Sequence, residues 1–219
     1  MTAMRNKQMK SLRKAVARYM RRLYKQGLTT ASGGNISVRV DNGIFITPSA
    51  LDKGTIRGNQ IGFITFEGEN LTPELKPSIE NVMHLALYRV RPDISAIVHA
   101  HPPIATSFTA MGRKIDCTLI AEARAILGTP VIANYALMGT KQLAEAVSAA
   151  ALETDSGKPN IVMMENHGVV CLGTDLLSAF DRLEVLEAAA RMTLITSLMG
   201  SVRPLKPDQL KEIDNLMNQ

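Results

Sequence analysis

The sequence predicts an α/β protein in which helices pack on a largely antiparallel sheet. Segments typical of strands and of helices are mixed along the chain without strict βαβ alternation. Several neighbouring strand segments are joined by turns of only a few residues, which favours antiparallel pairing. At 219 residues, with 46% hydrophobic and 21% charged residues, the chain is long enough to bury one sizeable core. We therefore expect a single domain over residues 1–219, with helices covering the sheet.

The first third of the chain begins with a helix and continues with strands. Leu12, Val16 and Tyr19 recur at helical spacing, and Gly27 is a typical helix stop. The segments that follow are apolar runs bounded by turn residues, beginning with a Gly-Gly turn. They predict strands within 29–40, 43–48 and 61–71.

The middle of the chain predicts a helix, a buried strand and a short helix. Apolar residues lie on one face of the segment 77–92, and Ser78 is its expected N-cap. The run "ISAIVHAH" over 94–101 is a strand that two prolines stop, and 104–112 is a short helix before a glycine.

The last third alternates strand and helix signals. A short strand is predicted within 129–136, and an alanine-rich helix over 140–152. The run "NIVMMENHGVVCLG" over 160–173 predicts two apolar strands about a polar turn. A long helix over 175–199 follows, with Thr174 as the expected N-cap and a glycine after its end.

The positive charge is confined to one segment. Nine Lys or Arg and no acidic residue lie within 1–25; without those nine, 16 basic residues face 20 acidic ones, a net charge of −4. A basic helix can bind nucleic acid or anionic lipid, or its charges can simply be solvated. Because no aromatic stacking pattern or nucleic-acid motif accompanies it, we expect a solvated helix face and no nucleic-acid partner.

The sequence favours a cytoplasmic location. No apolar run approaches the roughly 18 residues of a membrane span, and no apolar segment of a secretory signal follows the basic start. Cys117 and Cys171 form no CxxC pair and lie among apolar residues, so we expect reduced thiols in the core. We expect no membrane partner.

The stretch "VHAHPP" holds two of the four histidines of the chain. Alternate side chains of a strand face the same way, about 7 Å apart, so His99 and His101 should point into one space. Two prolines end the strand there, which places the pair at a sheet edge. Each histidine could be a hydrogen-bonded structural residue, or the pair could bind a metal ion. A cupin barrel also uses HxH, but the acidic residue it needs shortly afterwards is missing here.

A third histidine is a candidate for the remaining ligand of a metal site. His167 lies in the polar turn "ENHG" between two apolar strands. Three imidazole ligands would leave a fourth metal position for water or substrate, the pattern of catalytic zinc sites. The sequence alone does not show that the three side chains converge.

Two further polar residues fall in the helix predicted over 77–92. Glu80 lies in its first turn, where a carboxylate either interacts favourably with the helix dipole or serves as a base near a metal ion. His84 follows one turn later within an apolar face, so we expect a packed, hydrogen-bonded histidine.

The turns "SGGNIS" and "TPSA" and the helix start "KPSIE" could bind an anion through backbone N–H groups, or could simply be turns.

Taken together, these segments resemble the class II aldolase/adducin family. The segments that match are "LTTASGGNISVR", "IFITPSA", "KPSIENVMHLALYRVRPDISAIVHAHP", "VIANYALMGT" and "MMENHGVVCLGTDLLSAFDRLEVLEAAARM", in family order over most of 20–195. Among the family's enzymes, which also include L-ribulose-5-phosphate 4-epimerase, the chain is closest in kind to L-fuculose-phosphate aldolase.

The resemblance implies a three-layer αβα fold with a central, largely antiparallel sheet, and a homotetramer with active sites between subunits. It implies that His99, His101 and His167 bind a divalent metal, normally Zn²⁺, and that Glu80 is the catalytic acid/base and can also ligate the metal. For the substrate phosphate it implies a site formed by Gly34, Asn35, Ser49 and Ser78.

Three departures from the family pattern bear on the substrate. Ile79 stands where many members have a second Ser or Thr for the phosphate. The stretch matching 113–127 has no tyrosine, although the fuculose-phosphate enzyme takes one there from a neighbouring subunit. Finally, "HAHPP" replaces the more frequent "HTHS".

The expected function is a zinc-dependent aldehyde-lyase. It would cleave a phosphorylated ketose such as L-fuculose 1-phosphate into dihydroxyacetone phosphate and an aldehyde, through a metal-stabilised enediolate with Glu80 as proton carrier. The family's epimerases typically carry Asp at the position of Glu80. A pentulose-phosphate 4-epimerase and a methylthioribulose-1-phosphate dehydratase remain enzymatic alternatives. An adducin-like interaction module is the non-enzymatic one, although adducin heads lack the metal histidines.

Overall fold

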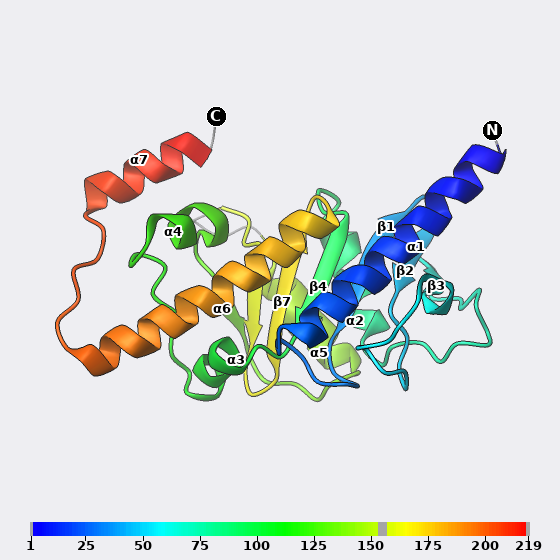
Figure 1. Ribbon diagram of the computed structural model, residues 1–219, viewed down its shortest axis with the longest axis horizontal. Helices are drawn as coiled ribbons and strands as arrows, with labels where there is room; N and C mark the ends of the chain where they lie inside the picture. The colour runs from blue at the N-terminus through cyan, green and yellow to red at the C-terminus, as the bar shows by residue number, and fades with distance from the viewer. Residues whose placement is uncertain (1, 153–156, 218–219) are drawn as a thin grey trace.

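The computed structural model describes residues 2–152 and 157–217, and its centre is one seven-stranded sheet (Figure 1). The order of the strands across the sheet is β3-β2-β1-β4-β7-β6-β5. In chain order the strands are β1 (Asn35–Val40), β2 (Gly43–Ile46), β3 (Gly62–Thr65), β4 (Ala96–Ala100), β5 (Val131–Ala133), β6 (Ile161–Met164) and β7 (Gly168–Gly173).

Antiparallel pairing dominates, as the short connections predict. Every neighbouring pair is antiparallel except β5 and β6, which run parallel because α5 connects them. In the centre of the sheet, His99 of β4 lies opposite Asn35 of β1 on one side and Val170 of β7 on the other. The fold class expected from the sequence is therefore confirmed.

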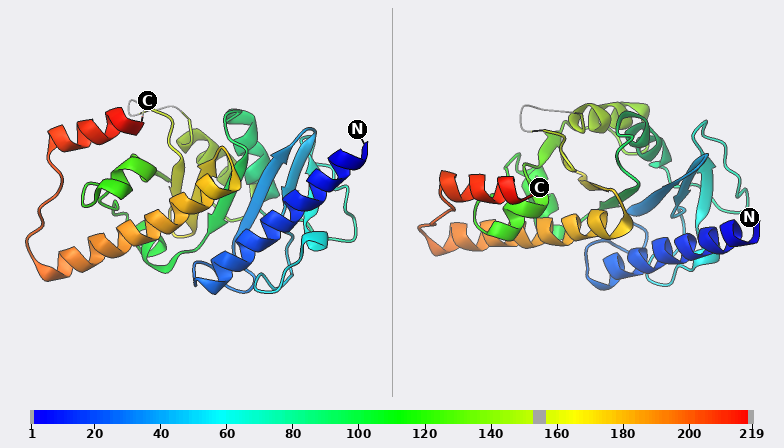
Figure 2. Two further views of the ribbon diagram at one scale, coloured as in Figure 1. Left: turned by 45° about the horizontal axis from the view of Figure 1, so that its top comes forward. Right: turned by 90° about the horizontal axis from the view of Figure 1, so that it is seen from above.

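The helices cover both faces of the sheet and make three layers. Figure 2 shows the first and sixth helices along one face, with the second and fifth against the other. The helices are α1 (Thr2–Lys25), α2 (Asn81–Val90), α3 (Pro103–Ala110), α4 (Ala121–Leu127), α5 (Lys141–Ala150), α6 (Leu176–Met199) and α7 (Pro207–Met217), with a short 3₁₀ turn at Gly58–Gln60.

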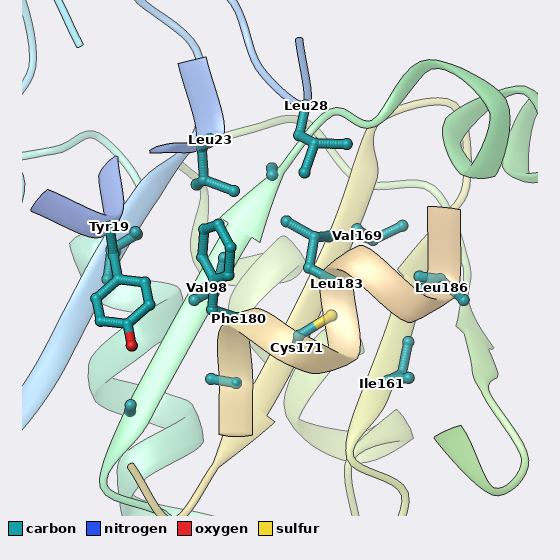
Figure 3. Close-up of a cluster of buried hydrophobic side chains, with 14 of the residues drawn as sticks. Tyr19, Leu23, Leu28, Val98, Ile161, Val169, Cys171, Phe180, Leu183 and Leu186 are labelled. Carbon is teal, nitrogen blue, oxygen red and sulfur yellow. The ribbon is translucent and has the colours of Figure 1, made fainter. Parts of the chain in front are cut away.

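Each layer boundary has its own hydrophobic core. The core beneath α1, α3, α4 and α6 contains Tyr19 and Phe180, whose ring centroids are 5.0 Å apart, and the buried thiol of Cys171 (Figure 3). The core beneath α2 and α5 contains residues such as Leu87 and Val147. Both predicted core thiols, Cys117 and Cys171, are buried and form no disulfide.

Several helix ends differ from those expected. α2 begins only at Asn81, with Glu80 rather than Ser78 at the N-cap position, and the Ser78 hydroxyl instead accepts a hydrogen bond from the Glu80 N–H. α6 is capped by Asp175 rather than Thr174, because the Asp175 carboxylate accepts the N–H of Ser178 at 2.7 Å. Two helices, α4 and α7, have no counterpart among the elements predicted from the sequence.

The basic helix α1 is more than a solvated face. Arg13 donates to the carbonyl oxygen of Ile61 and Arg21 to that of Ile56, each at 2.5 Å, so both guanidinium groups hold the loop that packs against α1. Arg22 faces Glu184 of α6 at 3.2 Å. Within 2–152 and 157–217, no helix is both long and apolar enough to cross a membrane.

Candidate active site

A cavity of about 370 Å³ lies where β4 ends and α2 begins. It is on the side of the sheet that α2 and α5 cover. Asn35 and His99 point to this side, because their strand neighbours Ile36 and Val98 belong to the core on the opposite side. The cavity is lined by every residue expected at a phosphate site and by three of the four at the metal site: Gly34, Asn35, Ser49, Ser78, Glu80, His101 and His167.

The three histidines converge. His99 and His101 point the same way from the end of β4, and the β6–β7 turn brings His167 beside them, because β7 is the sheet neighbour of β4. One ligand nitrogen from each lies within 4.8 Å of the others. His99 is completely buried behind the other two.

His99 is oriented with one nitrogen free for a ligand. Its Nδ1–H donates to the carbonyl oxygen of Val169 at 3.0 Å, which leaves Nε2 to face the cluster. Nε2 is buried and makes no well-oriented hydrogen bond to any described residue. A buried nitrogen of this kind fits a metal ligand, whose second nitrogen typically donates to a carbonyl or carboxylate.

Glu80 places its carboxylate between two of the histidines. Oε2 lies 3.1 Å from His99 Nε2, and Oε1 lies 3.1 Å from His167 Nε2. Burial alone raises the pKa of Glu80, but the charge of a protonated His99, the close approach of the His99 and His167 nitrogens and the hydrogen bond from Asn35 hold the pKa well below its usual range. Glu80 is therefore ionised at neutral pH.

His101 stays neutral in the same cluster. Burial, together with the neighbouring positive charges of His99 and His167, lowers the pKa of His101 to about 3. A neutral imidazole is the form that binds a metal ion. Three imidazoles and one carboxylate suit a divalent transition-metal ion such as zinc, so the donor set fits the metal that the sequence predicts.

A buried hydrogen-bond chain holds Glu80 in place. The Asn35 amide donates to Glu80 Oε2 at 2.7 Å and to Ser78 Oγ at 3.1 Å, and its Oδ1 faces His84 Nε2. Nε2 of His84 is therefore the donor, which leaves Nδ1 to accept from the Ser37 hydroxyl at 2.6 Å. His84 is thus the packed, hydrogen-bonded histidine that the sequence predicts.

Two glycines allow the backbone to approach the histidines. Gly34 has a φ of +63°, and a Cβ there would lie 2.8 Å from the His99 carbonyl oxygen. A Cβ on Gly168 would lie 2.6 Å from the His101 ring. Both glycines are therefore needed for close packing, whatever Gly34 contributes to ligand binding.

The cavity wall also contains residues that the sequence did not single out. Lys53, with 1% of its surface exposed, lines the wall beside Ser49. A lysine in a loop between glycines gives no sequence signal of burial. Ile79 and Met138 form an apolar part of the wall and are each at least half exposed.

Comparison with known proteins supports one family. The family model described as "Class II Aldolase and Adducin N-terminal domain" matches residues 14–194. An L-fuculose phosphate aldolase from Methanocaldococcus jannaschii is 33% identical over 187 residues, which cover 85% of this chain and 98% of that protein. A 3-oxo-tetronate 4-phosphate decarboxylase from Haemophilus influenzae is 33% identical over 201 residues, covering 89% and 92%.

A solved structure agrees over almost the whole chain. An L-fuculose 1-phosphate aldolase superposes with a TM-score of 0.85 at 28% identity, covering 95% of this chain and 97% of that one. The match therefore includes the sheet, both helical layers and the segments that carry the histidine cluster. The chain belongs to the class II aldolase and adducin family.

Proposed function

We propose that the protein is a metal-dependent aldolase that cleaves a phosphorylated ketose, similar to L-fuculose 1-phosphate, into dihydroxyacetone phosphate and an aldehyde. The observation that carries this proposal is the ionised carboxylate of Glu80, 3.1 Å from the nitrogens of both His99 and His167 at a cavity of about 370 Å³. A base beside a metal-binding cluster is the arrangement that proton transfer next to a carbonyl requires.

His99, His101 and His167 would hold the metal, with Glu80 as a fourth ligand before substrate arrives. Zinc is the ion we propose, and imidazole ligands would also accept cobalt, nickel or iron. When bound, the metal would supply positive charge to stabilise an enediolate.

The chain's own residues would position the substrate and move the proton. Gly34, Asn35, Ser49 and Ser78 would bind the phosphate at the polar end of the cavity. Glu80 would carry the proton to or from the substrate carbon, with its orientation held by the Asn35 amide at 2.7 Å. Ile79 and Met138 would contact the less polar end of the sugar.

The relatives are named for different substrates and reactions, so the reaction of this protein has to be tested directly. A 4-epimerase or a methylthioribulose-1-phosphate dehydratase could use the same cluster, and another relative is named for 5-deoxy-D-ribulose 1-phosphate. We favour the aldolase because Glu80 stands where the family's epimerases typically have Asp. The converging histidines argue against an adducin-like interaction module.

We further propose a cytoplasmic homotetramer. Its support is the family relationship together with the large apolar side chains exposed on the last turns of α6, among them Leu198 and Met199. Closed symmetry is the usual form of such assemblies.

The decisive experiment combines metal analysis with a product assay. The purified protein should contain about one divalent ion per chain, and His167→Ala should lose most of it while remaining folded by circular dichroism. Wild type should release dihydroxyacetone phosphate from at least one member of a panel of ketose 1-phosphates. The panel includes L-fuculose 1-phosphate and 5-deoxyribulose 1-phosphate. Full metal content in His167→Ala would refute the metal site. Conversion of the substrates without release of dihydroxyacetone phosphate and an aldehyde would refute the aldolase.

A further inference from the structure

Lys53 is a buried ammonium group without a carboxylate partner. Only 1% of its surface is exposed, and none of the ion pairs among the described residues includes it. Among the described residues, its Nζ donates one hydrogen bond, to the carbonyl oxygen of Pro48. An ammonium has three donors, so its hydrogen-bonding capacity is only partly used. A buried, uncompensated charge is costly and calls for a functional reason.

The position of Lys53 relates it to the polar end of the cavity. Lys53 lines the same cavity as Gly34 and Ser49, and its Nζ donates to the carbonyl oxygen of Pro48, the residue directly before Ser49. The backbone N–H of Lys53 donates to the carbonyl of Ala31 at 2.9 Å, which ties this loop to the turn that contains Gly34. The ammonium is therefore fixed next to the turns that would bind an anion.

Neutral donors at this end of the cavity are few. The Ser49 N–H already donates to the carbonyl oxygen of Lys76 at 3.0 Å, and the Asn35 amide group is engaged by Glu80 and Ser78. Ile79 contributes no hydroxyl. The remaining neutral donors, such as the Ser49 hydroxyl, carry no charge, so none of them offsets the negative charge of a phosphate dianion.

We propose that Lys53 binds the phosphate group of the substrate, supplying the positive charge that the neutral residues of this cavity do not. The proposal rests on the proposed function only in assuming that the substrate carries a phosphate ester. No basic residue other than Lys53 lines the cavity within the described ranges, apart from the two histidines of the cluster.

The electrostatic state of Lys53 predicts how binding depends on pH. Burial lowers the pKa of Lys53 to about 8, so the free site begins to lose its charge just above neutral pH. An anion binds the protonated form, so affinity should fall as pH rises above about 8. No basic side chain other than the histidines of the cluster lines the described cavity wall with Lys53, and the pKa values of Glu80 and His101 are both lowered, so neither group titrates in this range.

The first experiment uses inorganic phosphate as the probe, measured by calorimetry on the metal-loaded protein. Lys53→Met should weaken phosphate binding about 10- to 100-fold, because a hydrogen-bonded charge is lost. Metal content should not change, since Lys53 is not among the cluster ligands. Lys76→Met is the matched control: it removes an exposed lysine from a neighbouring loop and should leave phosphate binding as in wild type.

The second experiment uses sulfate, which remains a dianion across the whole range, so that any change with pH reports on the protein. Wild-type affinity should fall between about pH 7 and about pH 9.5, and Lys53→Arg should show a flat profile because arginine stays charged. If Lys53→Arg does not fold, the wild-type profile decides, since a site made of neutral donors would show no such fall.

The outcomes separate this inference from the proposed function. Equal phosphate affinity in wild type and Lys53→Met, or a flat wild-type sulfate profile, would overturn the role of Lys53 even if the protein is an active aldolase. Lys53-dependent phosphate binding in a protein that cleaves no ketose phosphate would support the role of Lys53 and refute the aldolase.

Discussion

At the scale of single residues, the site is organised by Asn35. Its amide oxygen receives the His84 N–H, and its amide nitrogen donates to the carboxylate of Glu80 and the hydroxyl of Ser78. Each of these side chains is buried. Because buried polar groups are costly when unpaired, the chain of bonds permits few orientations of Glu80, and its carboxylate is kept facing the histidines.

Replacing Glu80 with Gln should lower the reaction rate about 10²- to 10⁴-fold, the usual contribution of a general acid or base. Metal binding should persist, because three imidazole ligands remain. The measurement is exchange of the C3 hydrogen of dihydroxyacetone phosphate with solvent deuterium, which wild type should catalyse without an aldehyde.

The matched control is Glu187→Gln, which alters a buried carboxylate on the opposite face of the sheet that accepts the N–H groups of Ile104 and Ala105. It should exchange the hydrogen at close to the wild-type rate. Exchange at the wild-type rate in Glu80→Gln would show that another group is the base. Interconversion of two pentulose phosphates by wild type, with no exchange, would favour the epimerase.

His84 should make the folded protein sensitive to acid. Burial, with the charge of His99, lowers the pKa of His84 to about 3 from an ordinary 6.5. Between these values the unfolded chain binds a proton that the folded one does not, so stability rises with pH across this window and is lost as pH falls. One such proton corresponds to about 1.4 kcal/mol per pH unit.

The test is urea unfolding of the metal-free protein at several pH values between about 5 and about 6.5, where ordinary carboxylates change little. The free energy of unfolding should fall less steeply with acid in His84→Gln than in wild type, by about one proton. The other histidines are present in both proteins and cancel in the comparison. An unchanged slope would mean that His84 is protonated in the folded state.

At the scale of elements, the site depends on how closely the turn before β1 approaches β4. Gly34 occupies this turn in the left-handed region, beside the carbonyl oxygen of His99. Three antiparallel neighbours, β1, β4 and β7, supply Asn35, His99 and the turn that carries His167. The geometry of the metal site therefore depends on the register of two strand pairs, β1 with β4 and β4 with β7.

Gly34→Ala should destabilise the protein and disturb the metal site. The new Cβ would meet the His99 carbonyl oxygen at 2.8 Å, in addition to the backbone cost of about 1 kcal/mol for a positive φ. Gly68→Ala separates the two effects, because Gly68 has a φ of +93° and a Cβ added there would meet nothing within 4 Å. Only Gly34→Ala should lose metal affinity, as measured by titration with a chelator; equal losses in both variants would contradict this.

At the scale of the whole molecule, α6 extends beyond the sheet it covers. Its first turns pack in the core through residues such as Phe180 and Leu183, whereas Leu198 and Met199 near its end are about 80% exposed. After this end the chain turns back, and α7 lies beside α4, far from the N-terminus (Figure 1). The bidentate pair of Arg124 and Asp214, at 2.6 to 2.7 Å, joins α4 to α7. Exposed apolar side chains at such a position are typical of subunit contacts.

Introducing two charges there should therefore break the proposed assembly. Leu198→Glu combined with Met199→Glu should shift the mass measured by light scattering from a tetramer towards a monomer and lower the activity. Leu71→Glu, which places a charge on a half-exposed residue of a loop elsewhere, should leave the mass unchanged. An active wild-type monomer would refute the tetramer, and an intact double-variant tetramer would show that this end of α6 is not a contact.

Much of this organisation follows from local patterns that the sequence contains. The two-residue period of a strand requires His99 and His101 to face the same side, and the polar turn between two apolar runs exposes His167. Short connections between strands predict antiparallel pairing, and the matching segments predict the family. Helix ends are less well predicted at Ser78 and Thr174, because several small polar residues near each helix start can serve as the cap.

Only the tertiary structure decided which of these groups meet. His167 is 66 positions after His101 in the sequence, and the two come together because β4 and β7 are neighbours in the sheet. The same packing buries Lys53, which no local pattern distinguishes from an ordinary loop lysine. It also gives His84, expected from its apolar helix face to be packed, its partners Asn35 and Ser37. Periodicity determines the direction in which a side chain points, but its partners, burial and pKa depend on segments that are distant in the chain.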